Sequence, residues 1–294
     1  MLHCSPKNQD QYKQTGSCFD LKTLRKIAGS YNRHFKTNPI ERVDKKSFSV
    51  LKKQLETKLK KHCNDEICWV STLGLDHDKD INDHLRPKTP REWIDKPNTW
   101  LNNFNIEAVM MQYEKVYSDF KFLGVFPVNF EIRDDFNQCF FDDVCDVRMN
   151  HLLQKGFNYV GFIINLDRHD EPGSHWTGLF MCINPELPAY GIYYYDSVGS
   201  DAPPEMKAFM DKMKKQGGEK FKYVINSIQH QTGDSECGMF SMYYIIKWIT
   251  KVHKNKNTSF EEIVNTNIIN DENISKLRKV LFRPFYQFKK AIHG

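Results

Sequence analysis

The chain has 294 residues, of which 40% are hydrophobic, and its formal net charge is +5. This length fits one large domain, or one domain with an appendage, and the hydrophobic content supports a folded core and excludes a disordered chain. No run of about 18 apolar residues is present and the first twenty residues hold no apolar signal segment, so we expect neither a membrane span nor secretion.

The eight cysteines are expected to be reduced, because a chain of this length without a secretion signal belongs in a reducing, intracellular compartment. Several of them then serve as small buried hydrophobic residues. The charge is unevenly distributed, since residues 1–95 hold nineteen Lys and Arg against thirteen Asp and Glu, and the remainder carries about −1. A basic region can contact nucleic acid or an acidic partner, although a solvated helical face is the simpler explanation.

The sequence of the first region, residues 1–95, predicts helices. A weak helical pattern lies around Leu21 to Ile27, and residues 45–61 place apolar side chains at helical spacing among lysines: Phe48, Leu51, Leu55 and Leu59. His62, Cys63 and Cys68 follow, but a zinc site would need a second close pair of ligands, so we expect buried structural cysteines. Charged residues and three prolines mark residues 76–98 as a connector, which divides the chain near residue 95 into regions 1–95 and 96–294.

The second region predicts a sheet with helices. A helix follows Trp100 and runs through Val116, with Asn103 or Asn105 as its N-cap. Strands are expected at 122–130, 158–166, 175–183, 191–195 and 221–228, and helices at 203–215, from about Cys237, at 260–267 and at 273–281. The predicted class is α+β, with a mostly antiparallel sheet flanked by helices.

The stretch from Gln231 to Phe240 contains the best candidate for a nucleophile. Ser235 is a suitable N-cap and Glu236 a suitable first-turn residue, so a helix should begin close to Cys237. Unpaired N–H groups and the positive end of the helix dipole favour a thiolate at such a position.

A cysteine nucleophile needs a base, a group that orients the base and donors for the oxyanion. His175, at the start of a strand, is the preferred base, with His169 and His230 as competitors. Asp196 ends the neighbouring strand and can reach an imidazole, although an aspartate there can equally cap a turn. Gln231 can donate a side-chain N–H to the oxyanion together with the Cys237 backbone N–H, unless it is a solvated loop residue.

Four motifs in one order resemble a known family: His175-Trp176, Asp196-Ser197, Gln231, and Cys237-Gly238-Met239-Phe240. They are similar to the SUMO- and ubiquitin-like-protein-specific cysteine proteases, a superfamily that also includes adenovirus-type proteases. The segment from Trp100 to Ile106 resembles the opening of that catalytic domain, except that Asn103 replaces the usual aspartate. The resemblance implies a papain-like core in the circularly permuted order His-Asp-Gln-Cys.

Further local likeness points to the large-DNA-virus branch, which includes the African swine fever virus polyprotein protease. It is carried by Asn103 to Ile106, Ser174 to Trp176, His230-Gln231, Glu236 to Gly238 and Cys63 to Cys68. The resemblance implies a helical N-terminal arm before the core. That relative has asparagine as its third catalytic residue, where this chain has Asp196.

The resemblance also implies a reaction. A substrate chain would pass through a narrow tunnel between Trp100 and Trp176 and be cut after Gly-Gly or a similar small pair. Cys237 would attack, His175 would protonate the leaving amine, and no metal or cofactor would be needed. Trp100 could instead be a core residue.

We therefore expect a viral endopeptidase that processes structural polyproteins in the virion and in the cytoplasmic viral factory. The basic N-terminal arm favours this reading, because it could bind DNA or an acidic scaffold. The alternative is an isopeptidase that removes ubiquitin-like modifiers. An acyltransferase on the same scaffold, or an inactive binding module, ranks lower.

Overall fold

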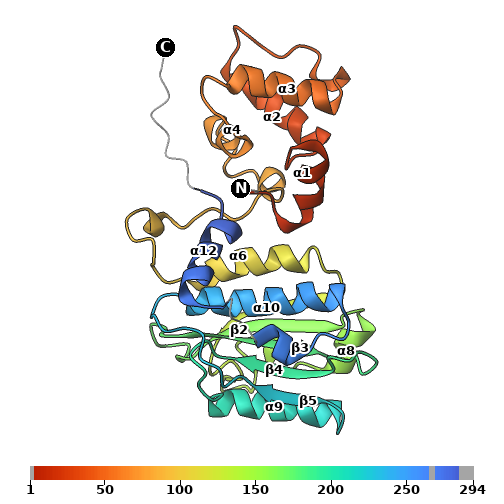
Figure 1. Cartoon of the computed structure of the whole chain (residues 1–294), viewed down its shortest axis with the longest axis vertical. Helices are drawn as coiled ribbons and strands as arrows, with labels where there is room; N and C mark the ends of the chain where they lie inside the picture. Colours follow the sequence, from red (N-terminus) through yellow and green to blue (C-terminus); the bar gives the residue numbers. More distant parts are fainter. Residues whose placement is uncertain (1–2, 265–268, 285–294) are drawn as a thin grey trace. The chain divides into compact units, whose positions relative to one another are not determined.

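The computed structural model describes residues 3–264 and 269–284. They form two compact units (Figure 1): one comprises the residues up to Arg91 together with those from Lys279 on, and the other comprises Glu92–Arg278. No pattern in the sequence indicated that residues after Arg278 would group with the first unit.

The first unit is helical. Its α-helices are α1 (Gln9–Thr15), α2 (Leu21–His34), α3 (Phe48–Leu59), α4 (Glu66–Thr72) and α5 (Lys79–Asn82), with short 3-10 helices η1 (Pro6–Asn8) and η2 (Val43–Lys45). The Asp20 carboxylate caps α2 by accepting from Thr23 N–H at 2.7 Å. Leu51, Leu55 and Leu59 of α3 are fully buried, so the predicted amphipathic helix is confirmed.

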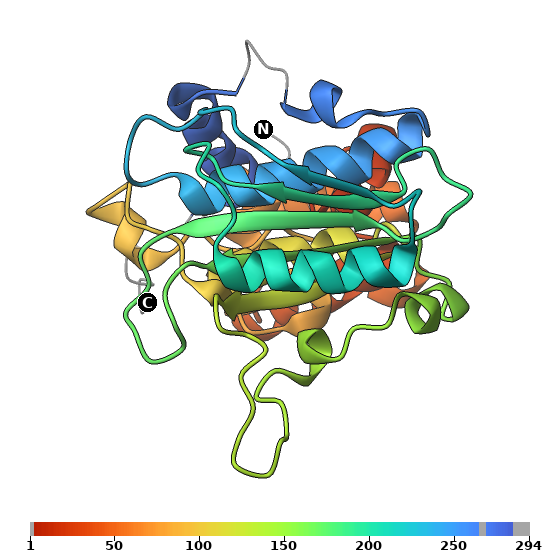
Figure 2. The same cartoon turned by 90° about the horizontal axis from the view of Figure 1, so that it is seen from below.

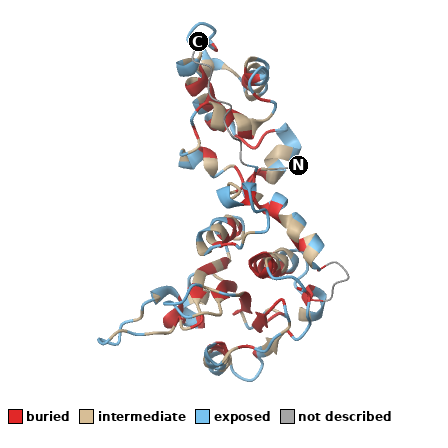
Figure 3. Ribbon diagram, turned by 90° about the vertical axis from the view of Figure 1, so that its left-hand side faces the viewer, coloured by how far each residue is buried: buried red, intermediate tan, exposed pale blue. Residues whose placement is uncertain are grey.

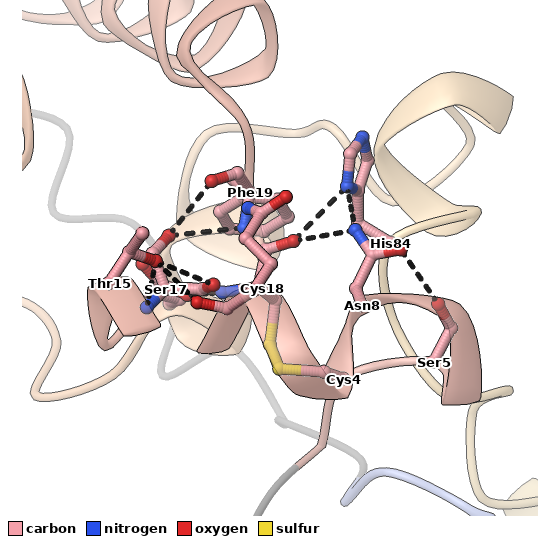
Figure 4. Close-up of a disulfide and its surroundings, with 10 residues drawn as sticks. Cys4, Ser5, Asn8, Thr15, Ser17, Cys18, Phe19 and His84 are labelled. Atoms are coloured by element: carbon pink, nitrogen blue, oxygen red, sulfur yellow. Dashed lines mark hydrogen bonds between the residues drawn. A yellow bond between two sulfur atoms is a disulfide. The ribbon is translucent and has the colours of Figure 1, made fainter. Parts of the chain in front are cut away.

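The expectation of reduced cysteines is wrong for six of the eight. Disulfides join Cys4 to Cys18 (Figure 4), Cys63 to Cys68 and Cys139 to Cys145, with Cα–Cα distances of 5.1, 5.6 and 6.2 Å. These distances lie in the range that a disulfide bridges without backbone movement. The fold brings the two cysteines of each pair together, and the spacing of cysteines in the sequence does not show this proximity. Cys182 and Cys237 are the two free cysteines, and both are buried.

A thiol count tests this pairing. Denatured, unreduced protein is expected to react with two equivalents of Ellman's reagent, and reduced protein with eight, because only Cys182 and Cys237 are unpaired. Peptide mapping without reduction should recover the Cys4–Cys18 link. Eight reactive thiols before reduction, in protein kept from reductant during preparation, would contradict the pairing.

The second unit is built on a five-stranded sheet in the order β1-β2-β3-β4-β5. The strands are β1 (Phe120–Pro127), β2 (Tyr159–Asn165), β3 (Trp176–Cys182), β4 (Gly191–Tyr195) and β5 (Lys222–Ile225). The α+β class is confirmed, but the sheet is mixed: β2-β3 and β3-β4 pair antiparallel, whereas β1-β2 and β4-β5 pair parallel. A parallel pair needs a crossover connection, and the helix between β4 and β5 provides one.

Helices cover both faces of the sheet (Figure 2): α10 packs on β3 and β2 and α6 on β1, while α9 lies against β4 and β5 on the opposite face. The helices that lie wholly or mostly in this unit are η3 (Arg91–Ile94), α6 (Asn103–Glu114), α7 (Asp142–Cys145), α8 (Met149–Gln154), α9 (Pro204–Gly217), α10 (Cys237–Lys254), α11 (Phe260–Val264) and α12 (Asp271–Leu281). Residues 265–267, which the sequence also placed in a helix, lie outside the described residues.

Two helix starts differ from expectation. The N-cap of α6 is Asn102, which forms a capping box with Asn105, so neither Asn103 nor Asn105 is the cap. The N-cap of α10 is Glu236 and not Ser235, and the Glu236 side chain makes no cap hydrogen bond. A buried arginine holds that carboxylate instead, and this tertiary partner outweighs the local capping preference.

The strands of the sheet and the helices packed on them contain many buried residues (Figure 3). Trp248 of α10 stacks on Phe180 of β3 with ring centroids 4.8 Å apart, and Phe209 of α9 meets Phe162 of β2 edge-on at 5.3 Å. The central strands therefore have apolar neighbours on both faces, which explains their almost continuous hydrophobic sequence. Among the described residues, no helix is both long enough and apolar enough to span a membrane.

Candidate active site

His175 and Asp196 meet at one edge of the sheet. Because β3 and β4 pair antiparallel, with Gly178 opposite Tyr195, the residue before β3 and the residue after β4 lie side by side. His175 Nε2 lies 2.8 Å from Asp196 Oδ1, and the Asp196 side chain is 1% exposed. The Val198 N–H also donates to Oδ1 at 2.9 Å, so Asp196 both caps a turn and contacts the imidazole.

The environment of His175 favours its protonated form. Burial lowers the pKa of His175, but hydrogen bonds to Asp196 and Cys237 outweigh burial and raise the pKa to about 9. Since Nε2 faces Asp196, Nδ1 is the ring nitrogen available to Cys237. The raised pKa favours the imidazolium, which is the form that can pair with a thiolate and later donate a proton.

The two competing histidines have other partners. His169 is hydrogen-bonded to Asn129, with its Nδ1 2.8 Å from the amide nitrogen. His230 is buried, and its two nitrogens contact the Tyr195 hydroxyl and the Val264 carbonyl. Of the three candidates, only His175 is placed against Cys237.

Cys237 is the first residue of α10 and is 2% exposed. The start of this helix is packed closely against its surroundings: a Cβ on Gly238 would lie 3.1 Å from Leu101 and 3.2 Å from Trp176. The Ser241 hydroxyl contacts both the Trp176 and Cys237 carbonyls. Gly238, the glycine after Cys237, therefore allows α10 to approach β3.

Gln231 is buried rather than solvated, with 2% exposure. The Ser197 hydroxyl donates to Gln231 Oε1 at 2.6 Å, and Gln231 Nε2 donates to the Gly233 carbonyl at 2.8 Å. These two hydrogen bonds identify Oε1 as the acceptor and Nε2 as the donor of the Gln231 amide. An amide has two N–H bonds, so one donor remains beyond the Gly233 contact. The contribution of Ser197 was not anticipated, because its hydroxyl reaches across 34 positions.

The two tryptophans differ in exposure. Trp176 is 9% exposed and its Nε1 donates to the Leu101 carbonyl at 2.9 Å, whereas Trp100 is 45% exposed. Trp100 is therefore not a core residue in this structure. Trp176 combines packing against Gly238 with a position directly after His175.

This difference predicts separable effects of alanine substitution. Trp176→Ala should destabilise the protein by about 3–5 kcal/mol, because a buried indole and its hydrogen bond are lost. Trp100→Ala should change the free energy of unfolding by less than about 0.5 kcal/mol, as for other exposed positions. Urea unfolding measures both values. Equal destabilisation by the two substitutions would show that Trp100 is packed in the core.

The structure thus brings a cysteine, a histidine and an aspartate together at the start of α10. The family model "Ulp1 protease family, C-terminal catalytic domain" matches residues 142–289, half of the chain. The chain belongs to the Ulp1 protease family.

Similarity to two viral proteases extends over most of the chain. The chain is 29% identical over 299 aligned positions to a thiol protease of Acanthamoeba polyphaga mimivirus, covering 95% of this chain and 93% of the relative. It is 27% identical over 270 positions to a cysteine protease of African swine fever virus, covering 84% of this chain and 93% of the relative. A crystal structure of a protease from African swine fever virus matches the fold, with a TM-score of 0.64, 20% identity, and coverage of 97% of this chain and 96% of that one.

The raised pKa of His175 predicts the alkaline limb of the pH profile. Hydrolysis of a peptide should fall as pH rises through about 9, because the imidazolium is lost there. Asp196→Asn removes the negative charge that helps to raise this pKa, so the limb should move to lower pH. Profiles of kcat/KM for both proteins measure the shift. An unmoved limb would show that Asp196 does not set the protonation of His175.

Proposed function

We propose that the protein is a cysteine endopeptidase that cleaves after Gly-Gly or a similar small pair and processes viral structural polyproteins during virion maturation. The observation that carries the proposal is the extent of the similarity to proteases of large DNA viruses. It covers 95% and 84% of this chain and so includes much of the helical first unit as well as the protease fold.

In the proposed mechanism, the Cys237 thiolate attacks the carbonyl carbon of the second glycine, and the peptide bond from that carbon to the next residue breaks. The positive charge on His175, which Asp196 supports at 2.8 Å, stabilises the thiolate before the attack. The Cys237 N–H and the remaining N–H of Gln231 donate to the oxyanion. His175 then protonates the leaving amine, and water hydrolyses the thioester.

We further propose that Trp100 and Trp176 restrict the substrate near the scissile bond. Trp100 is exposed and Trp176 packs on Gly238, beside the nucleophile. Indole rings on both sides of a substrate chain leave room only for residues without large side chains, which explains a preference for glycine.

A second candidate function is removal of ubiquitin-like modifiers. It is favoured by a relative: a protein from a Kenyan pig isolate of African swine fever virus is named a SUMO-1 cysteine protease and is 27% identical to this chain. Both functions use the same reaction, and they differ in whether a folded modifier must be recognised.

One experiment separates the two functions. The protein is incubated with peptides that carry an internal Gly-Gly-X sequence and with SUMO and ubiquitin conjugates, each also against the Cys237→Ala variant. The polyprotein proposal expects efficient cleavage of the peptides. Cleavage of conjugates without cleavage of peptides would overturn it in favour of the isopeptidase.

The basic first unit is proposed to bind nucleic acid or an acidic scaffold in the virion or the viral factory. On α3, Lys53 is exposed, as are Lys60 and Lys61 directly after it. Affinity for double-stranded DNA should fall steeply with added salt if these lysines contact phosphates. Unchanged affinity after Lys53, Lys60 and Lys61 are replaced with glutamine would remove this contact from the proposal.

A further inference from the structure

The segment between Gln231 and Cys237 has to place two proposed oxyanion donors, yet it forms no helix or strand. Thr232, Gly233 and Asp234 are exposed. Residues 231–237 are called the nucleophile loop here. Ser197 holds its first residue, Gln231, and α12 contacts the residues between Gln231 and Cys237.

Asp271, at the start of α12, binds the first half of the nucleophile loop. Its Oδ2 accepts from Thr232 N–H at 2.9 Å and from Gly233 N–H at 3.1 Å, and the Thr232 hydroxyl contacts the same oxygen. Gly233 is also the residue whose carbonyl accepts from Gln231 Nε2. Asp271 thus binds the N–H of Gly233, the residue whose carbonyl accepts from the Gln231 amide.

Arg278, two helical turns later, binds the second half. Its Nε lies 3.0 and 2.9 Å from the two carboxylate oxygens of Glu236, and its Nη2 donates to the Ser235 carbonyl at 3.2 Å. Both side chains are only 6% exposed. A buried charge pair that is hydrogen-bonded in this way permits little movement, because separating the charges leaves each without a partner. Glu236 immediately precedes Cys237.

Arg278 also reaches the segment that leads to Trp100. Its Nη1 donates to the Thr99 carbonyl at 3.0 Å, and its guanidinium group lies 4.2 Å from the centre of the Trp93 ring. One side chain therefore joins the residue before the nucleophile to the residue before Trp100.

We propose that Asp271 and Arg278 are positioning residues, which act through the nucleophile loop to set the oxyanion donors and Cys237. Residues seven apart lie on one face of a helix, so α12 supports the loop at two points. The inference rests on the proposed roles of Gln231 and Cys237. The inference adds Asp271 and Arg278 to the candidate active site, and both come from α12, a helix that contributes no reacting group.

Steady-state hydrolysis of a Gly-Gly-X peptide tests the first point of support. Asp271→Ala is expected to lower kcat by about 10- to 100-fold with little change in KM, because displaced oxyanion donors affect the transition state. Asp271→Asn keeps an acceptor oxygen and should restore much of the activity. Glu272→Gln, which alters an exposed ion pair on the same helix, is the matched control and should match the wild type.

Alkylation of Cys237 by iodoacetamide tests the second point without any peptide. Arg278→Lys cannot reproduce the forked contacts, and it is expected to slow alkylation by about tenfold because Cys237 shifts relative to His175. Asp271→Ala should leave this rate near the wild-type value. If Arg278→Lys does not fold, Glu236→Gln, which removes the charge of the Arg278 partner, takes its place in the same measurement, and a wild-type alkylation rate in that variant would overturn positioning by Arg278.

The outcomes distinguish the inference from the proposed function. Wild-type kcat in folded Asp271→Ala would overturn positioning by Asp271, and a wild-type alkylation rate in folded Arg278→Lys would overturn positioning by Arg278. If the wild-type protein cleaves conjugates and not peptides, only the proposed polyprotein function is overturned. The kcat values of the Asp271 variants are then measured with a conjugate as the substrate.

Discussion

The Cys237→Ala variant is expected to lose hydrolysis of Gly-Gly-X peptides by at least about 10⁴-fold, because no other group in the site can form the thioester. Cys237 is the first residue of α10, and its thiol contacts His175. The variant should still fold, since alanine differs from cysteine by a single sulfur atom and favours a helix. Peptide cleavage followed by mass spectrometry measures the loss.

The chain provides a matched control for this substitution. Cys182 is the other free and buried cysteine, and burial raises the pKa of its thiol to about 12, so it is an unreactive thiol at neutral pH. Cys182→Ala is expected to keep wild-type kcat. Loss of activity in folded Cys182→Ala, with retention in Cys237→Ala, would assign the nucleophile to Cys182 and contradict the site described above.

His175→Gln is expected to lower kcat/KM by about 10²- to 10⁴-fold, the usual contribution of a positioned acid–base group. Glutamine keeps a hydrogen-bonding side chain beside Asp196 but cannot carry the proton to the leaving amine. The loss should appear at every pH, because no nearby residue replaces the imidazolium. Initial rates at peptide concentrations below KM would measure kcat/KM.

His169→Gln controls for the loss of a histidine. His169 lies in the connection between β2 and β3 that leads to His175, and its side chain is hydrogen-bonded to Asn129. Replacing His169 should leave kcat/KM near the wild-type value. Equal losses in the two variants would indicate that this connection is disturbed and that His175 has no specific role.

The order of the elements could be predicted because their patterns are local. The β-branched and aromatic runs at 159–165 and 176–182 mark buried strands, and the leucine spacing of α3 marks an amphipathic helix. The parallel pairing of β1 with β2 and of β4 with β5 could not be predicted. It depends on which edge each strand joins, and residue patterns within a strand do not carry that information.

The candidate site was only partly accessible from the sequence. His175 and Asp196 could be placed together because each lies at the end of an expected strand, and the structure brings them to 2.8 Å. Arg278 could not be found, since it pairs with Glu236 across 42 positions and no spacing rule connects them. The disulfides could not be predicted either, because the sequence does not show which cysteines the fold brings together.

The central claim is that Cys237 is activated by His175, and the rate of thiol alkylation measures it most directly. Native wild-type protein and His175→Gln are treated with iodoacetamide at neutral pH, and modification of Cys237 and Cys182 is followed by peptide mass spectrometry. We predict rapid alkylation of Cys237 alone in the wild type and a rate at least about 100-fold lower in His175→Gln. Equal Cys237 rates in the two folded proteins would contradict the account.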